Sequence, residues 1–132
     1  MTSEQIVQLE KLLERVFGFA SFRPGQLEII ETILAKQNVL AVMPTGAGKS
    51  LCYQLPAIYS EQKTIIVSPL VALMDDQVSS LSQVGVPVSK IHSGVSRQEN
   101  VEQWKRFAWN ECNILYLSPE RLMQTRMIDA LK

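Results

Sequence analysis

The chain has 132 residues, enough for one domain with a buried core, and its 46% hydrophobic and 20% charged residues exclude a disordered protein. Basic and acidic residues both total 13, so the net charge of zero excludes a strongly basic protein that coats DNA, although local phosphate contacts stay open. No apolar stretch reaches the length of a membrane span, and the N-terminus does not resemble a signal peptide. Cys52 and Cys112 form no C-x-x-C pair, so we expect buried, reduced thiols in a cytoplasmic protein without membrane contact.

The first segment of the chain has the pattern of two helices. Thr2 and Gln5 stand at capping-box spacing, and apolar residues then recur at helical spacing over residues 6–17 until Gly18 ends the helix. Pro24 suits the first turn of a second helix, which we expect to continue over residues 27–34.

From residue 38 onward, strand-like runs alternate with stretches of helical spacing. The runs are 39–43, 64–68, 86–91 and 113–117. Such alternation predicts an α/β fold in which helices flank a parallel sheet. Ser96 and Glu99 form a further capping box, which should open the helix before the last strand.

A glycine-rich loop follows the first of these strands. Residues 43–50 read MPTGAGKS, which approaches the phosphate-binding pattern G-x-x-x-x-G-K-[ST] but has Met43 in place of the first glycine. In such a loop the backbone N–H groups and a helix N-terminus hold phosphate, Lys49 reaches the β- and γ-phosphates, and the Ser50 hydroxyl ligates Mg²⁺. The alternative is an ordinary glycine turn between a strand and a helix.

Two strands of the predicted sheet end in a Ser-Pro pair, Ser68-Pro69 and Ser118-Pro119. Serine would be the N-cap and proline the first helical residue of the helix that follows. Because the strands are parallel, both junctions lie at the carboxyl edge of the sheet, where open α/β sheets bind ligands. They are therefore either anion sites or plain helix caps.

Other polar and aromatic residues favour structural roles. His92, the single histidine, has no acidic or cysteine partner at ligand spacing, so we expect a surface or structural side chain. Asp75 and Asp76 fall within a predicted helix, where a solvated face is the better interpretation than a Mg²⁺ pair. Trp104 shares an apolar stripe, so core packing is favoured over base stacking for Trp104, and Trp109 carries no separate assignment.

Taken together, four blocks resemble superfamily 2 helicases, and among them the RecQ-type DNA helicases. The blocks are FGFASFRPGQ at 17–26, MPTGAGKS at 43–50, VSPLVALMDDQV at 67–78 and YLSPERLM at 116–123. They occur in the family's order and span nearly the whole chain. In this superfamily a loop that begins with methionine is usual, so the resemblance accounts for Met43.

The resemblance implies an ATP site with Mg²⁺ as a second cofactor. Gln26 would read the adenine edge, since its amide both donates and accepts hydrogen bonds, while Phe19 would stack on the base and Arg23 would lie beside the nucleotide. Lys49 would be the catalytic residue and Ser50 the Mg²⁺ ligand. The phosphates would be held by Pro44, Thr45, Gly46, Ala47, Gly48, Lys49 and Ser50.

The resemblance also implies two segments that contact the phosphate backbone of single-stranded or duplex DNA. They are Ser68, Pro69 and Leu70, and Ser118, Pro119, Glu120 and Arg121.

We therefore expect residues 1–132 to be a partial, RecA-like P-loop domain, with an N-terminal helix and adenine-recognition segment over residues 1–37. The family's Asp-Glu-Ala-His block is absent, as is a second RecA-like domain, so the domain should be incomplete at its C-terminal end. The parent protein would couple ATP hydrolysis to 3′-to-5′ DNA unwinding, whereas this chain should bind nucleotide weakly without unwinding DNA. The alternatives are an inactive nucleotide- or DNA-binding fragment, another superfamily 2 helicase, or a different P-loop NTPase.

Overall fold

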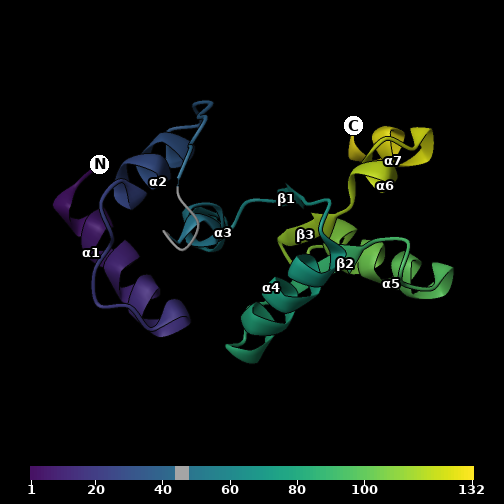
Figure 1. Cartoon of the computed structure of the whole chain (residues 1–132), viewed down its shortest axis with the longest axis horizontal. Coiled ribbons are helices and arrows are strands. Elements are labelled where there is room, and N and C mark those ends of the chain that lie inside the picture. The colour runs from purple at the N-terminus through teal and green to yellow at the C-terminus, as the bar shows by residue number, and fades with distance from the viewer. Residues whose placement is uncertain (44–47) are drawn as a thin grey trace. The chain divides into compact units, whose positions relative to one another are not determined.

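The computed structural model describes residues 1–43 and 48–132. The chain forms two compact units, Met1–Glu61 and Gln62–Lys132. The helices and strands are labelled in Figure 1. None of the helices in the described ranges is long and apolar enough to cross a membrane.

The first unit is helical in its described part. Its elements are α1 (Ser3–Leu12), the π-helical turn η1 (Leu13–Phe17), α2 (Gln26–Leu34) and α3 (Lys49–Ser60). The predicted capping box is confirmed, because Thr2 Oγ1 accepts from Gln5 N and Thr2 N donates to Gln5 Oε1. Gly18 ends η1 in the left-handed conformation, as expected for a helix C-terminus.

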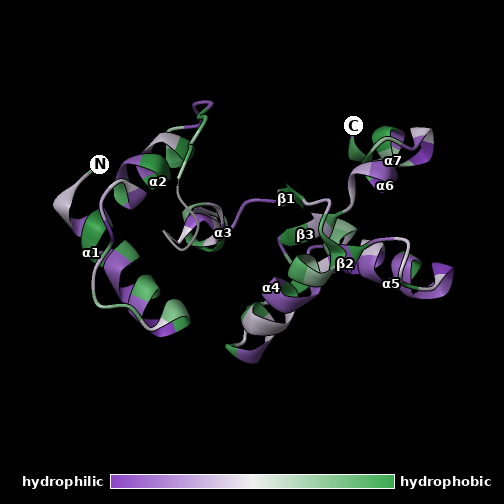
Figure 2. Cartoon of the chain, viewed as in Figure 1, coloured by the Kyte–Doolittle hydropathy of each residue, from purple (hydrophilic) through white to green (hydrophobic). Residues whose placement is uncertain are grey.

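The core of this unit is built from apolar residues at helical spacing. Figure 2 shows hydrophobic and hydrophilic segments alternating around α1, as expected for a helix with one apolar face. The buried cluster consists of Leu9, Leu13, Ile30, Leu51 and Leu55. It joins α1, η1, α2 and α3 and so fixes the turn before α2 relative to the start of α3.

Two local expectations for this unit are wrong. Pro24 precedes α2 rather than opening it, because Gly25 takes a left-handed φ of 87° at the N-cap and the helix begins one residue later. Residues 39–43 form no strand, and Leu40 and Val42 are 92% and 90% exposed. A strand is stabilised by pairing, and in the described part of the chain β1, β2 and β3 pair only with one another, so this apolar run has no ladder partner.

The second unit contains a three-stranded parallel sheet in the order β1–β3–β2, which confirms the expected α/β class. The strands are β1 (Thr64–Val67), β2 (Val88–Ile91) and β3 (Ile114–Leu117). The helices are α4 (Val71–Gln83), α5 (Arg97–Ala108), α6 (Pro119–Leu122) and α7 (Thr125–Leu131). The last three predicted strands are thus confirmed with slightly shorter bounds.

Helices α4 and α5 cover opposite faces of this sheet. Successive strand residues point to opposite faces. On one face, Tyr116 of β3 donates to Gln77 of α4 at 2.6 Å. On the other, Leu115 and Leu117 pack with Phe107 of α5 in the cluster of Ile91, Phe107, Cys112, Leu115 and Leu117.

The roles of Trp104 and the two cysteines match the expectations, whereas the predicted capping box of α5 is only half formed, because the Glu99 carboxylate accepts from Gln103 Nε2. Ser96 Oγ accepts from Glu99 N at 3.2 Å at the start of α5. Trp104 packs against the α5 cluster, as expected of a core side chain. Cys52 and Cys112 are free and buried, and burial raises the pKa of the Cys52 thiol, which keeps it neutral.

Candidate nucleotide-binding site

The turn before α2 is organised by the side chain of Gln26, the first residue of that helix. Its Oε1 accepts from the backbone N–H of Arg23 at 2.8 Å, and its own backbone N–H donates to the carbonyl of Arg23 at 3.1 Å. Gln26 is only 2% exposed. Without the family resemblance, the sequence would suggest that Gln26 is a solvated helix residue. The structure excludes that interpretation.

The same amide connects this turn to the phosphate-loop motif. Gln26 Nε2 donates to the carbonyl of Gly48, the N-cap of α3, at 3.3 Å. Gly48 has a left-handed φ of 76°, and a Cβ at this position would collide with Gln26 Nε2. Glycine is thus required here twice, for its backbone conformation and for the close approach of the glutamine.

A pocket of about 320 Å³ opens beside this contact. It is lined by Phe17, Phe19, Ser21, Arg23, Gln26, Gly48, Ser50 and Leu51. Five of the predicted site residues therefore surround one cavity, although their sequence positions span 19 to 50. The Arg23 guanidinium lies 6.0 Å from the centroid of the Phe19 ring, a cation–π distance, which pairs the predicted stacking and basic residues.

Sequence reasoning missed three lining residues, namely Phe17, Ser21 and Leu51. Phe17 carried a signal, because it opens the block FGFASFRPGQ, but its helical spacing favoured a core role. Ser21 and Leu51 carried none beyond proximity to the motifs.

The start of α3 supplies the groups expected to hold phosphate and a metal ion. Gly48 precedes the first turn, whose N–H groups lack helical carbonyl partners, and Lys49 is an exposed side chain at the first helical position. Ser50 lines the pocket and offers one hydroxyl ligand; Mg²⁺ takes its other ligands from phosphate and water oxygens in such sites. Four further predicted residues, Pro44, Thr45, Gly46 and Ala47, lie outside the described residues.

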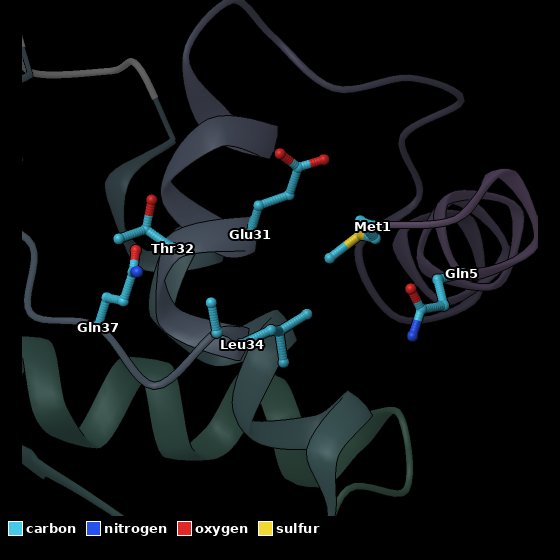
Figure 3. Close-up of a pocket in the computed structure, with 7 residues that line it drawn as sticks. Met1, Gln5, Glu31, Thr32, Leu34 and Gln37 are labelled. Atoms are coloured by element: carbon cyan, nitrogen blue, oxygen red, sulfur yellow. The ribbon is translucent and has the colours of Figure 1, made fainter.

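Another pocket in the first unit has a different chemistry. It measures about 420 Å³ and is lined by the N-terminal end of α1 and the C-terminal half of α2 with the residues that follow it, as Figure 3 shows. Its lining residues are Met1, Gln5, Glu31, Thr32, Leu34, Ala35 and Gln37. Glu31 is the one charged side chain among them, so this pocket is unsuited to the phosphates of a nucleotide.

The carboxyl edge of the sheet holds both predicted DNA segments. Val67 and Ile91 are both in register with Leu117, so the residue after each strand lies at the same edge. Ser68 N donates to the Leu117 carbonyl at 3.1 Å, and Ser118 N donates to the Ile91 carbonyl at 3.2 Å. The predicted convergence of the two Ser-Pro junctions is therefore confirmed.

The first junction does not cap its helix as predicted. Helix α4 begins at Val71 with Leu70 as N-cap, so Pro69 lies outside the helix. Ser68 Oγ instead accepts from Leu70 N at 3.3 Å, a local turn that delays the helix by two residues. The Leu70 side chain is 60% exposed.

The second junction has the predicted positions but not the predicted hydrogen bond. Ser118 is the N-cap and Pro119 the first residue of α6, as expected. However, Ser118 is 1% exposed, and its Oγ has no partner in the described structure, so this hydroxyl neither caps the helix nor reaches the surface. Glu120 is exposed and Arg121 half-buried, which leaves Arg121 as the cation of this segment.

A polar cluster on the α4 face of the sheet adds a contact between Asp75 and His92 that the sequence interpretations did not include. Asp75 Oδ1 accepts from Lys90 Nζ at 2.8 Å and lies 3.1 Å from Nε2 of His92. The N–H of Gly94 donates to His92 Nδ1, so Nε2 of the neutral ring carries the proton and donates to Asp75. Asp75 thus remains partly solvated, with 44% of its side chain exposed, and His92 is the structural histidine, 3% exposed, with an acidic partner 17 residues away.

These bonds also set the ionisation of the carboxylate. The hydrogen bond from Lys90, followed by that from His92, holds the pKa of Asp75 below its usual range, against the opposing effect of burial. In the described part of the chain, no group of three or more His, Cys, Asp or Glu side chains is arranged to hold a metal ion.

Comparison with known proteins places this arrangement in a family. Residues 23–132 match the family model described as DEAD/DEAH box helicase. A protein named ATP-dependent DNA helicase RecQ from Synechocystis sp. is 44% identical over 124 residues, which cover 94% of this chain and 26% of that protein. The RecQ of Bacillus subtilis is 41% identical, covering 93% of this chain and 21% of that protein. ATP-dependent DNA helicase Q1 of Mus musculus is 35% identical, covering 91% and 19%.

The chain therefore belongs to the DEAD/DEAH box helicase family. The resemblance to RecQ-type helicases that the four sequence blocks indicated is confirmed by these relatives. The chain spans about a quarter or less of the length of these relatives.

Proposed function

We propose that residues 1–61 carry the adenine-nucleotide site of a RecQ-type helicase, and that the whole protein couples ATP hydrolysis to 3′-to-5′ unwinding of DNA. One observation carries this proposal. Phe19, Arg23, Gln26, Gly48 and Ser50 line a single pocket at the N-terminus of α3. An aromatic ring, an amide and a helix N-terminus are the groups that bind a base at one end and phosphates at the other.

Within this proposal, each group has a separate task. Gln26 reads the adenine edge and, through its bond to the Gly48 carbonyl, couples base recognition to the position of the phosphate loop. Lys49 binds the β- and γ-phosphates, and the Ser50 hydroxyl is the protein ligand of the Mg²⁺ that accompanies ATP. When bound, the metal ion neutralises charge on the transferred phosphoryl group.

The DNA contacts belong to the carboxyl edge of the sheet in the second unit. The Ser68 hydroxyl of the segment 68–70 and the side chain of Arg121 are the groups that we propose to bind strand phosphates. Ser118 shapes this turn without offering a donor to DNA, because its hydroxyl is buried and its N–H donates to the Ile91 carbonyl.

Altering the nucleotide rather than the protein tests the role of Gln26. Gln26→Ala would remove two internal hydrogen bonds at once, so a loss of binding could arise from misfolding. We expect ATP to bind tighter than CTP, and 7-deaza-ATP to bind about fivefold weaker than ATP, because one hydrogen bond to N7 is worth roughly 1 kcal/mol. Equal affinities for the three nucleotides, measured by calorimetry with Mg²⁺, would remove adenine reading from this site.

The phosphate-binding role is tested with a pair of lysine variants. Lys49→Ala should weaken ATP binding at least tenfold, since a charge-assisted contact contributes roughly 1.5–3 kcal/mol. Lys11→Ala, which removes an exposed lysine from α1, is the control and should bind ATP like the unaltered chain. DNA-stimulated phosphate release that Lys49→Ala abolishes would assign hydrolysis to this chain; ATP binding without release would restrict its role to holding the nucleotide.

A further inference from the structure

A third pocket lies in the second unit, between α5 and the α6–α7 segment. It measures about 450 Å³, within the usual range for small-molecule sites. Arg97, Arg121 and Arg126 line it, each from a different helix. Its wall also includes the indole of Trp104 and the apolar side chains of Ile91 and Met127.

Among the described residues, the three arginines of this pocket have no counter-charge. No acidic residue is among the side chains that line it. Within the described ranges, none of the three arginines forms an ion pair, not even with Glu99, Glu120 or Asp129, which lie within three residues of them in sequence. Arg97 also occupies the first position of α5, where the helix dipole disfavours a cation and favours an anion.

We propose that this pocket binds a nucleotide unit, with its phosphate on the arginines and its base against the Trp104 wall. A guanidinium group binds two phosphate oxygens at once through parallel hydrogen bonds. Several guanidinium groups around one cavity therefore favour a phosphate as ligand over a single carboxylate. Nucleobases stack on aromatic and guanidinium planes, so the same pocket accommodates both ends of the ligand. The half-open pocket of about 450 Å³ has the size of a site for one small molecule such as a nucleotide, rather than for an extended acidic peptide. This site is independent of the pocket around Gln26, which is lined by residues of the first unit.

The two tryptophans of the chain make a local reporter possible. Trp104 lines the pocket, whereas Trp109 is 68% exposed. In the background Trp109→Phe, Trp104 is the single tryptophan, because the chain has 2 in all. Its fluorescence is followed while AMP is added at constant ionic strength, and we expect a saturable change.

Matched variants locate the response. The double variant Arg97→Gln/Arg126→Gln should weaken AMP binding at least tenfold, since roughly 1.5–3 kcal/mol goes with each charge-assisted bond and 1.4 kcal/mol is tenfold. Both side chains are exposed, so their removal should leave the fold intact. Arg15→Gln, an exposed arginine of η1, is the control and should change nothing. If the fluorescence change on AMP addition disappears with Lys49→Ala but survives the double variant, AMP binds at the pocket around Gln26 instead, and this proposal is overturned.

A ligand series identifies the chemistry. Adenosine lacks the phosphate and ribose 5-phosphate lacks the base, so each should bind at least tenfold weaker than AMP. An octamer of deoxyadenylate that binds tighter per nucleotide than AMP would identify a DNA strand as the source of the nucleotide unit, and weaker binding would identify free nucleotides. Hexaglutamate binding as tightly as AMP would overturn the proposal in favour of an acidic peptide, and the absence of any saturable change would overturn it outright.

Discussion

Replacing Gly48 by alanine tests the contact on which the candidate nucleotide site depends. Gly48 has φ of 76° at the N-cap of α3, and its carbonyl accepts from Gln26 Nε2. A methyl group here would meet that nitrogen, so the glutamine must move away. Since the Oε1 of the same amide accepts from Arg23 N, this movement also disturbs the turn before α2.

The expected cost has two parts. A residue with a side chain in the left-handed region costs roughly 1–2 kcal/mol relative to glycine. Displacing a buried amide from its partners adds about 1–3 kcal/mol. We therefore expect Gly48→Ala to lower the free energy of unfolding by roughly 2–5 kcal/mol.

Gly18→Ala is the matched control for the first part of this cost. Gly18 has nearly the same φ, 77°, it lies in the same unit, and an added Cβ would have nothing within 4 Å. Its cost should be about 1–2 kcal/mol, the backbone contribution alone. Urea unfolding followed by far-ultraviolet circular dichroism measures both variants. If Gly48→Ala is no more destabilising than Gly18→Ala, the Gln26 contact does not constrain residue 48 and the reasoning is refuted.

Two further predictions concern the sheet unit. Asp75→Asn should lower the free energy of unfolding at pH 7, and the difference from the unaltered chain should shrink as the pH falls below about 4. The reason is that the lowered pKa of Asp75 gives stability that is present above the unfolded pKa of about 3.9 and is lost as the pH falls through the folded pKa. Unfolding at pH 7 and pH 3 checks this, and a constant deficit would mean that the carboxylate charge is not involved. Tyr116→Phe removes the donor to Gln77 and should cost about 1–2 kcal/mol in urea unfolding, whereas a cost near zero would show that the bond at 2.6 Å adds no net stability.

Periodicity was sufficient to predict the strands of the sheet, although β1 is only partly buried and its partner β3 lies far along the chain. The strands β1, β2 and β3 and their parallel pairing follow from apolar runs separated by helical spacing. The residue pairs at the carboxyl edge follow from parallel topology alone. In contrast, the turn at Ser68 depends on one hydroxyl accepting from Leu70 N instead of capping a helix, and sequence spacing does not distinguish these two bonds.

For the candidate site, sequence motifs located the residues but not their connections. The two motifs around residues 17–26 and 43–50 were chosen separately, yet the structure joins them through the Gln26 amide. Burial of that glutamine could not be predicted, because glutamine on a helix is mostly solvated. The bond between His92 and Asp75 was missed for a similar reason, since the two residues come from a strand end and a helix brought together by the sheet.

The apolar run 39–43 leads to the last prediction, which separates hydrophobic sequence from hydrophobic burial. Leu40 is 92% exposed in the folded chain, so Leu40→Ala changes little surface on unfolding and should alter stability by less than about 0.5 kcal/mol. Leu115 in β3 is 0% exposed, and Leu115→Ala should cost about 2–5 kcal/mol, the transfer of the lost atoms plus the cavity left behind. Urea unfolding compares the two variants directly. Similar losses of unfolding free energy for both variants would show that residues 39–43 are buried in solution, as expected for the strand that the sequence predicts there.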